Sequence, residues 1–157
     1  MTAPQMARPP ELDALEILRG TIQGKGRAAA GPFGPEHAMS GALSAQWELG
    51  KMWLSFAWTE ERTPEHPMPM NGKGYWGYDA SAKRYVGVWV DGSGAIMNGT
   101  SPGWVDDKLV WTWEGAMMGR PAKVRGTWAR AGGKIVGGVW HLNLGEGWNQ
   151  LMDMTFA

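Results

Sequence analysis

From residue 20 onward, turns rich in Gly, Pro, Asn and Asp divide the chain into short segments, and no helical period interrupts them. Segments of about 7 to 12 residues between such turns are typical of antiparallel barrels and sandwiches. The turns at 91–94, 131–134 and 145–147 supply the glycines that tight hairpins need at positive φ. We therefore expect consecutive up-and-down hairpins with strands at approximately 20–29, 38–49, 52–61, 70–78, 84–91, 94–101, 107–115, 122–131, 134–142 and 147–156.

The segment 10–18 predicts one short helix before the strands begin. Leu12, Leu15 and Leu18 recur three residues apart, Pro10 stands at the start, and Gly20 follows the end. Residues 1–9 read as a disordered lead and residues 10–157 as a single domain, since a chain of this length forms one core. The expected fold is an all-β, antiparallel up-and-down barrel of about ten strands with this one helix.

Composition excludes several kinds of chemistry. The absence of cysteine rules out disulfides, thiolate catalysis and iron-sulfur clusters, and it fits a cytoplasmic location. Fifteen basic and fifteen acidic residues are scattered along the chain, so neither nucleic acid nor an anionic membrane is an expected partner. The three histidines lack the paired spacing of a metal site, and no Gly-x-Ser-x-Gly nucleophile motif occurs. No metal is expected.

Alternation along each strand assigns an inward face that is rich in Trp and Met. In 52–58, for example, Leu54, Phe56 and Trp58 share one face and Ser55 and Ala57 the other. Such a wall suits an apolar or aromatic guest, although side chains alone fill many barrels. The residues expected to line the interior are Phe56, Trp58, Trp76, Tyr78, Trp89, Asp91, Met97, Trp111, Trp113, Trp128, His141 and Met152.

Three of these residues could perform acid/base chemistry. Asp91 follows Trp89 on one face, which would place it in the barrel mouth, but Asp-Gly is also a turn signature. His141 falls on the face of Ile135 and Val139, where it could move a proton, ligate haem or be a satisfied structural residue. Tyr78 would help to orient a guest. The other two histidines, at 37 and 66, lie in Pro/Gly-rich loops and are expected to be solvated.

Strand 84–91 has two apolar faces. Tyr85, Trp89 and Asp91 share one face, and Val86, Val88 and Val90 share the other. Either the strand is covered on both sides or its valines meet another subunit, which would make the protein a homodimer. The segment 63–69 contains three prolines, so it cannot be a central strand and is expected to be an exposed loop that overhangs one mouth of the barrel.

The segment 77–91, with its Gly-Tyr-Asp turn followed by Tyr-x-Gly-x-Trp-x-Asp, resembles the bacterial family called domain of unknown function 1579. The resemblance extends over most of the chain and implies a calycin-type barrel, similar in shape to lipocalins and fatty-acid-binding proteins. In such families the indole of a Gly-x-Trp motif at the first strand closes the base of the barrel. This chain has Gly20-Thr21-Ile22 at that place, so other residues must close its base. The family's activity is unknown, and the resemblance assigns no site residue.

Three functions remain open from the sequence. The first is non-covalent binding of a small apolar or aromatic molecule inside the barrel. The second is a cofactor-free cyclase, isomerase or dehydratase in which Asp91, His141 and Tyr78 act on such a molecule. The third is a structural dimer module with a filled barrel. No cofactor is expected; haem through His141 is an alternative, because nitrobindin-like barrels hold haem through one histidine, but their motif is not matched here.

Overall fold

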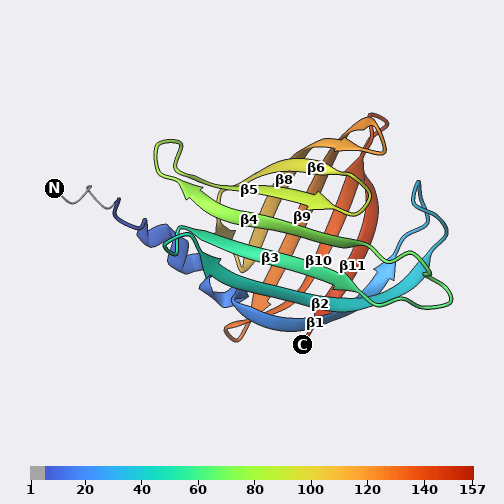
Figure 1. The fold of residues 1–157 in the computed structure, drawn as a ribbon, viewed down its shortest axis with the longest axis horizontal. Helices are drawn as coiled ribbons and strands as arrows, with labels where there is room; N and C mark the ends of the chain where they lie inside the picture. Colours follow the sequence, from blue (N-terminus) through green and yellow to red (C-terminus); the bar gives the residue numbers. More distant parts are fainter. Residues whose placement is uncertain (1–5) are drawn as a thin grey trace.

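The computed structural model describes residues 6–157, which form one short helix and eleven strands. All strands except the two-residue β7 close into a single antiparallel barrel, seen from its side in Figure 1. The predicted all-β barrel of about ten strands with one short helix is confirmed. The elements are η1 (Pro10–Leu18), β1 (Gly20–Ala28), β2 (His37–Glu48), β3 (Trp53–Glu60), β4 (Asn71–Asp79), β5 (Arg84–Asp91), β6 (Ile96–Ser101), β7 (Trp104–Val105), β8 (Lys108–Met117), β9 (Arg120–Ala131), β10 (Lys134–Asn143) and β11 (Asn149–Phe156).

Most strands pair with their neighbours in the chain, as up-and-down hairpins require. Two other pairings complete the barrel: β6 pairs with β8 past the short β7, and β1 pairs with β11. In the second seam, Gly26 of β1 lies opposite Met154 of β11. Backbone hydrogen bonds between Gln23 and Ala157 extend this seam at its end. The sheet therefore has no open edge along these strands.

The leucines of η1 fill one end of the barrel. The element is a 3₁₀ helix, which has three residues per turn, so residues three apart lie on one edge. Leu12, Leu15 and Leu18 occupy that edge and are at most 2% exposed. Burial of each side chain contributes about 1.5 to 3 kcal/mol. This helix lies at the left end of the barrel in Figure 1, far from the loops at the right.

Three aromatic side chains anchor η1 by hydrogen bonds. The Tyr85 hydroxyl donates to the Glu11 carbonyl over 2.7 Å, and the Trp104 indole N–H donates to the Ala14 carbonyl over 2.9 Å. Trp47 Nε1 donates to Glu16 Oε2 over 2.6 Å, and this bond lowers the pKa of Glu16. Burial raises the pKa of Tyr85, which keeps its hydroxyl protonated as a donor.

The expected disordered lead falls partly outside the described residues, namely at 1–5. Within 6–9, the Arg8 guanidinium lies 4.6 Å from the centroid of the Trp47 ring and makes an ion pair of 2.5 Å with Asp13. These contacts attach the end of the lead to η1 and to β2.

An irregularity in β10 reverses the face predicted for His141. The pairing of β10 with β9 shifts register between Ile135 and Gly137, so the side chains beyond it exchange faces. Trp140 and Leu142 consequently lie on the inward face, and His141 between them lies on the outward face. The expectation that His141 projects into the barrel is wrong, because this side chain does not line the cavity.

The two faces of β5 are now distinguished. Tyr85 is buried and Trp89 faces the interior, whereas Val86 and Val88 point outward and are half-buried. Val90 is 45% exposed and pairs with Ile96 of β6, which is 55% exposed. The outer surface of β5 and β6 therefore carries an exposed apolar strip.

Candidate functional site

The barrel interior has two levels of different character. The level next to η1 is filled, and five of its side chains are completely buried: Leu12, Leu15, Leu54, Leu109 and Trp111. The opposite level contains a cavity of ≈ 470 Å³. Its lining comes from the last residues of β3 and β5 and the first residues of β2, β4 and β11, which all lie at the end away from η1. The helix therefore closes one end of the barrel and leaves the other end as the mouth.

Aromatic and thioether side chains make up most of the cavity wall. Several rings pack on one another: Phe56 stacks on Trp89 with centroids 5.7 Å apart, and Trp128 stacks on Phe156 at 5.6 Å. These contacts hold flat faces in fixed positions along the wall. The aromatic members are Phe33, Phe56, Trp58, Trp76, Trp89, Trp113, Trp128, Trp140 and Phe156, and the methionines are Met39, Met68, Met70, Met97, Met117, Met152 and Met154.

Glycines on neighbouring strands make room for the rings. A Cβ atom at Gly72 would lie 1.9 Å from the Trp89 ring, and one at Gly99 would lie 2.4 Å from the Trp113 ring. The indoles thus lie directly over the backbone of adjacent strands, which explains why so many strand residues are glycine.

Most residues expected inside the barrel line this cavity, namely Phe56, Trp58, Trp76, Trp89, Asp91, Met97, Trp113, Trp128 and Met152. The others lie elsewhere. Trp111 belongs to the filled level, where it stacks on Trp76 at 4.6 Å. Tyr78 packs edge-on against Tyr85 at the helix end of the barrel. His141 lies on the outer face, as described above. Alternation identified the inward face but not the level along the barrel axis.

Asp91 combines both roles that the sequence left open. It lines the cavity, and its Oδ1 accepts hydrogen bonds from Ser93 N and Ala95 N in the following turn. Ser93 Oγ also donates to Oδ1, and Trp89 Nε1 donates to Oδ2 over 3.0 Å. Oδ1 thus accepts from three donors and Oδ2 from one; since each carboxylate oxygen has two lone pairs, Oδ2 keeps one acceptor position open. Asp91 therefore fixes the turn and the Trp89 ring.

Asp79 forms the turn after β4, as Gly-Tyr-Asp predicts. Its Oδ1 accepts from Ser81 Oγ over 2.7 Å and from the backbone N–H groups of Ser81 and Ala82. The hydrogen bond from Ser81 lowers the pKa of Asp79. This residue has a structural role and lies at the helix end of the barrel.

A buried carboxylate at the mouth escaped the sequence analysis. The side chain of Glu60, at the end of β3, is only 3% exposed. Its Oε1 accepts from Trp58 Nε1 over 3.1 Å, and its Oε2 accepts from Met70 N over 2.8 Å and from His66 Nε2 over 2.7 Å. Trp58-Thr59-Glu60 thus repeats the arrangement of Trp89-Val90-Asp91, an indole donating to the acid two residues later. That spacing was the signal available in the sequence.

His66 is not solvated, contrary to expectation. Its side chain is 20% exposed, hydrogen-bonded to Glu60 and stacked on the His37 ring, with centroids 4.2 Å apart. The Pro-rich loop between β3 and β4 carries it over the cavity, together with Met68 and Pro69. The loop therefore overhangs the mouth, as its prolines predicted.

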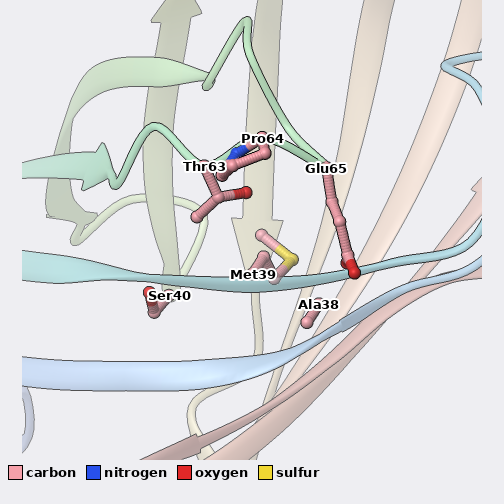
Figure 2. Close-up of a pocket in the computed structure, with 6 residues that line it drawn as sticks. All are labelled: Ala38, Met39, Ser40, Thr63, Pro64 and Glu65. Atoms are coloured by element: carbon pink, nitrogen blue, oxygen red, sulfur yellow. The ribbon is translucent and has the colours of Figure 1, made fainter.

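A second hollow of ≈ 460 Å³ lies between the same loop and β2. Figure 2 shows Thr63 and Pro64 of the loop beside Met39 of β2, with the Glu65 side chain hanging next to the strand. Met39 lines both hollows. The loop thus borders the rim of the barrel next to a side chain that also belongs to the cavity wall.

Two fully buried indole N–H groups have no hydrogen-bond acceptor within residues 6–157. They belong to Trp76, in the cavity wall, and Trp111, directly behind it. Their burial without partners costs stability that the surrounding aromatic contacts must offset.

Comparison with known families gives a match over residues 9–156 to the model described as "Protein of unknown function (DUF1579)". The chain belongs to this family. The match covers nearly all of this DUF1579 protein, including every strand and the helix. The resemblance inferred from residues 77–91 is thereby confirmed. A search of curated proteins finds no match for the chain.

Among solved structures, this DUF1579 barrel is similar to the one titled "Crystal Structure of Rv2717c from M. tuberculosis". The TM-score is 0.70 at 15% sequence identity, and the alignment covers 96% of this chain and 98% of the other. At this identity the similarity concerns the fold, which supports a complete barrel with its closing helix.

Within residues 6–157, no three His, Asp or Glu side chains converge in a way that could hold a metal ion. The same part of the chain contains no helix that is long and apolar enough to span a membrane.

Proposed function

We propose that the protein binds a small, largely apolar aromatic molecule inside the barrel. The observation that carries this proposal is the cavity of ≈ 470 Å³, whose wall is made mainly of indole, phenyl and thioether groups. Ligand pockets of about 300 to 1,000 Å³ with apolar walls and few polar groups are the usual form of small-molecule sites. Flat rings held in place by stacking offer faces on which an aromatic guest can pack.

Native mass spectrometry of freshly purified protein should detect a retained guest, and calorimetric titration with 2-methoxynaphthalene should give saturable binding. Replacement of Ala28, a small residue in the cavity wall, by a large side chain should block this binding. We expect Ala28→Phe to weaken binding about tenfold or more, because the added ring occupies the cavity.

Ala38→Phe is the matched control. Ala38 lies on the adjacent strand but on the outer face, opposite Arg27 rather than Ala28. The affinity of the Ala38→Phe variant for 2-methoxynaphthalene should equal that of the wild type. Absence of binding to the wild type, or equal binding by both variants, would contradict a guest inside the barrel.

A cofactor-free acid/base enzyme acting on such a guest is the second candidate. The pair Glu60 and His66 at the cavity favours it, whereas Asp91 already accepts four hydrogen bonds and Tyr78 and His141 do not line the cavity. Incubation of the protein with its retained guest distinguishes the two candidates by mass spectrometry. An unchanged guest favours a binder, and a product favours an enzyme.

A structural role as a homodimer is the third proposal, favoured by the exposed strip at Val90 and Ile96. Sedimentation equilibrium should then give a dimer for the wild type and a monomer for Val90→Lys. Val136→Lys, at a valine that is 41% exposed on β10, is the control and should leave the dimer intact. A wild type that is monomeric at high concentration contradicts this proposal.

A further inference from the structure

We propose that the guest of the cavity carries a hydroxyl group, as a phenol does, and that His66 Nδ1 accepts a hydrogen bond from it. This inference rests on the proposed binding of an aromatic molecule and adds the chemical class of that molecule. Glu60, which also lines the cavity, acts here as a positioning residue through its hydrogen bond to His66.

The first step of the argument is the tautomer of His66. Glu60 accepts from three N–H groups, and two of them, Trp58 Nε1 and Met70 N, can only donate. This environment suits an ionised carboxylate, which is an acceptor without a proton of its own. His66 Nε2 must then carry the proton that points at Glu60. In a neutral imidazole the other nitrogen, Nδ1, is left with a lone pair.

The second step is the fixed position of the His66 ring. Its backbone N–H donates to the Thr63 carbonyl over 3.0 Å and to Thr63 Oγ1 at the same distance, which closes a tight turn in the loop. The ring stacks on His37 and reaches back to the carboxylate of Glu60. The acceptor is therefore held in place before a guest arrives, so little freedom is lost on binding.

The third step is a comparison with the other polar groups of the cavity lining. Asp91 already accepts four hydrogen bonds from its own turn and from Trp89, and Asn71 Oδ1 already accepts from Glu60 N over 3.3 Å. Within residues 6–157, no hydrogen bond involves His66 Nδ1. His66 Nδ1 is thus a positioned acceptor in the cavity lining that no protein donor occupies.

His37 is the nearest competitor, because it also lines the cavity. Its Nδ1 lies 3.0 Å from the Pro35 carbonyl, which leaves Nε2 as an acceptor when the ring is neutral. A hydrogen bond to a carboxylate is stronger than one to a neutral carbonyl, so the orientation of the His66 ring is fixed more firmly than that of His37. The geometry therefore favours His66 over His37.

The test compares 2-naphthol with 2-methoxynaphthalene, which has the same ring but no hydroxyl donor. By calorimetry at neutral pH, the wild type should bind 2-naphthol about tenfold more tightly than the ether, the effect of one well-placed hydrogen bond. In His66→Phe this preference should fall to within about twofold.

His37→Phe tests the competing acceptor and should keep the preference. His141→Phe, which makes the same change on the outer face of the barrel, is the matched control and should also keep it. Equal affinities of the wild type for both probes would overturn the inference and leave the proposed binding intact. A preference that survives in His66→Phe, or that disappears only in His37→Phe, would also overturn it. Failure of both probes to bind the wild type would instead contradict the proposed function itself.

A measurement on the wild type keeps the inference testable if His66→Phe does not fold. Long-range ¹H–¹⁵N spectra report which ring nitrogen of His66 carries the proton. We expect the proton on Nε2 and a shift of the Nδ1 resonance when 2-naphthol is added, with no such shift for 2-methoxynaphthalene. A proton on Nδ1, or the same response to both probes, would contradict the assignment.

Discussion

Replacing Trp111 by alanine is expected to lower the free energy of unfolding by about 3 to 5 kcal/mol, the range for removal of a large aromatic side chain from a core. Trp111 is completely buried and stacks on Trp76 at 4.6 Å and on Trp113 at 5.3 Å. Its indole N–H has no acceptor within the described residues, so the substitution removes no hydrogen bond. The whole effect comes from lost contacts and the space left behind.

Urea denaturation followed by circular dichroism measures this effect, and Trp148→Ala provides the comparison. Trp148 is 38% exposed and lies under the Arg125 guanidinium, 4.5 Å from the ring centroid. Its removal should cost only about 0.5 to 1 kcal/mol, the value of an exposed contact between a cation and a ring. A cost below about 1 kcal/mol for Trp111→Ala would mean that the filled level can collapse onto the missing ring.

The second large effect is expected at Gly26, where alanine should destabilise the fold by about 3 kcal/mol, at the upper end for overpacking. A Cβ atom at this position would lie 1.8 Å from the Asp153 carbonyl oxygen and 2.9 Å from Met154 Cα. Both are backbone atoms of β11, so no side chain can rotate away to relieve the clash. The strands β1 and β11 must move apart at this point of the seam.

Urea denaturation measures the loss of stability in Gly26→Ala, and hydrogen exchange shows where in the barrel it occurs. Amides of β1 and β11 that pair near Gly26 should lose protection, whereas those of β4 and β5 should not. Gly31→Ala is the control, because a Cβ atom there meets nothing within 4 Å and the backbone has no positive φ. Wild-type stability and protection in Gly26→Ala would show that the seam tolerates the extra atom.

Strands and turns could be predicted well because their determinants are local. The strand expected at 84–91 has these bounds in the structure, and Gly132 and Gly133 have φ of 57° and 73°, as a tight hairpin requires. The three-residue spacing of the leucines indicated the helix and suits its 3₁₀ form. The two-residue β7 was missed because Trp104 and Val105 are too few to produce an alternating pattern.

The candidate site could be predicted only in part, because it depends on relations between distant residues. Alternation places Trp111 and Trp128 on inward faces equally well, but only the structure assigns the first to the filled level and the second to the cavity. A single register shift in β10 changed the face of His141, and nothing in the local composition marks it. The contact of His66 with Glu60 depends on how a proline-rich loop folds back, which sequence periodicity does not describe.

The seam between β1 and β11 also governs when the protein can finish folding during its synthesis. Thr155 donates to the carbonyl of Lys25, a partner 130 residues earlier in the chain. Until the ribosome has made and released β11, β1 keeps an unpaired edge and the apolar interior stays open to water. Pairing over such a separation is slow, because the intervening chain must first be ordered. The nascent chain is therefore expected to depend on chaperones that cover strand edges more than a helical protein of the same length.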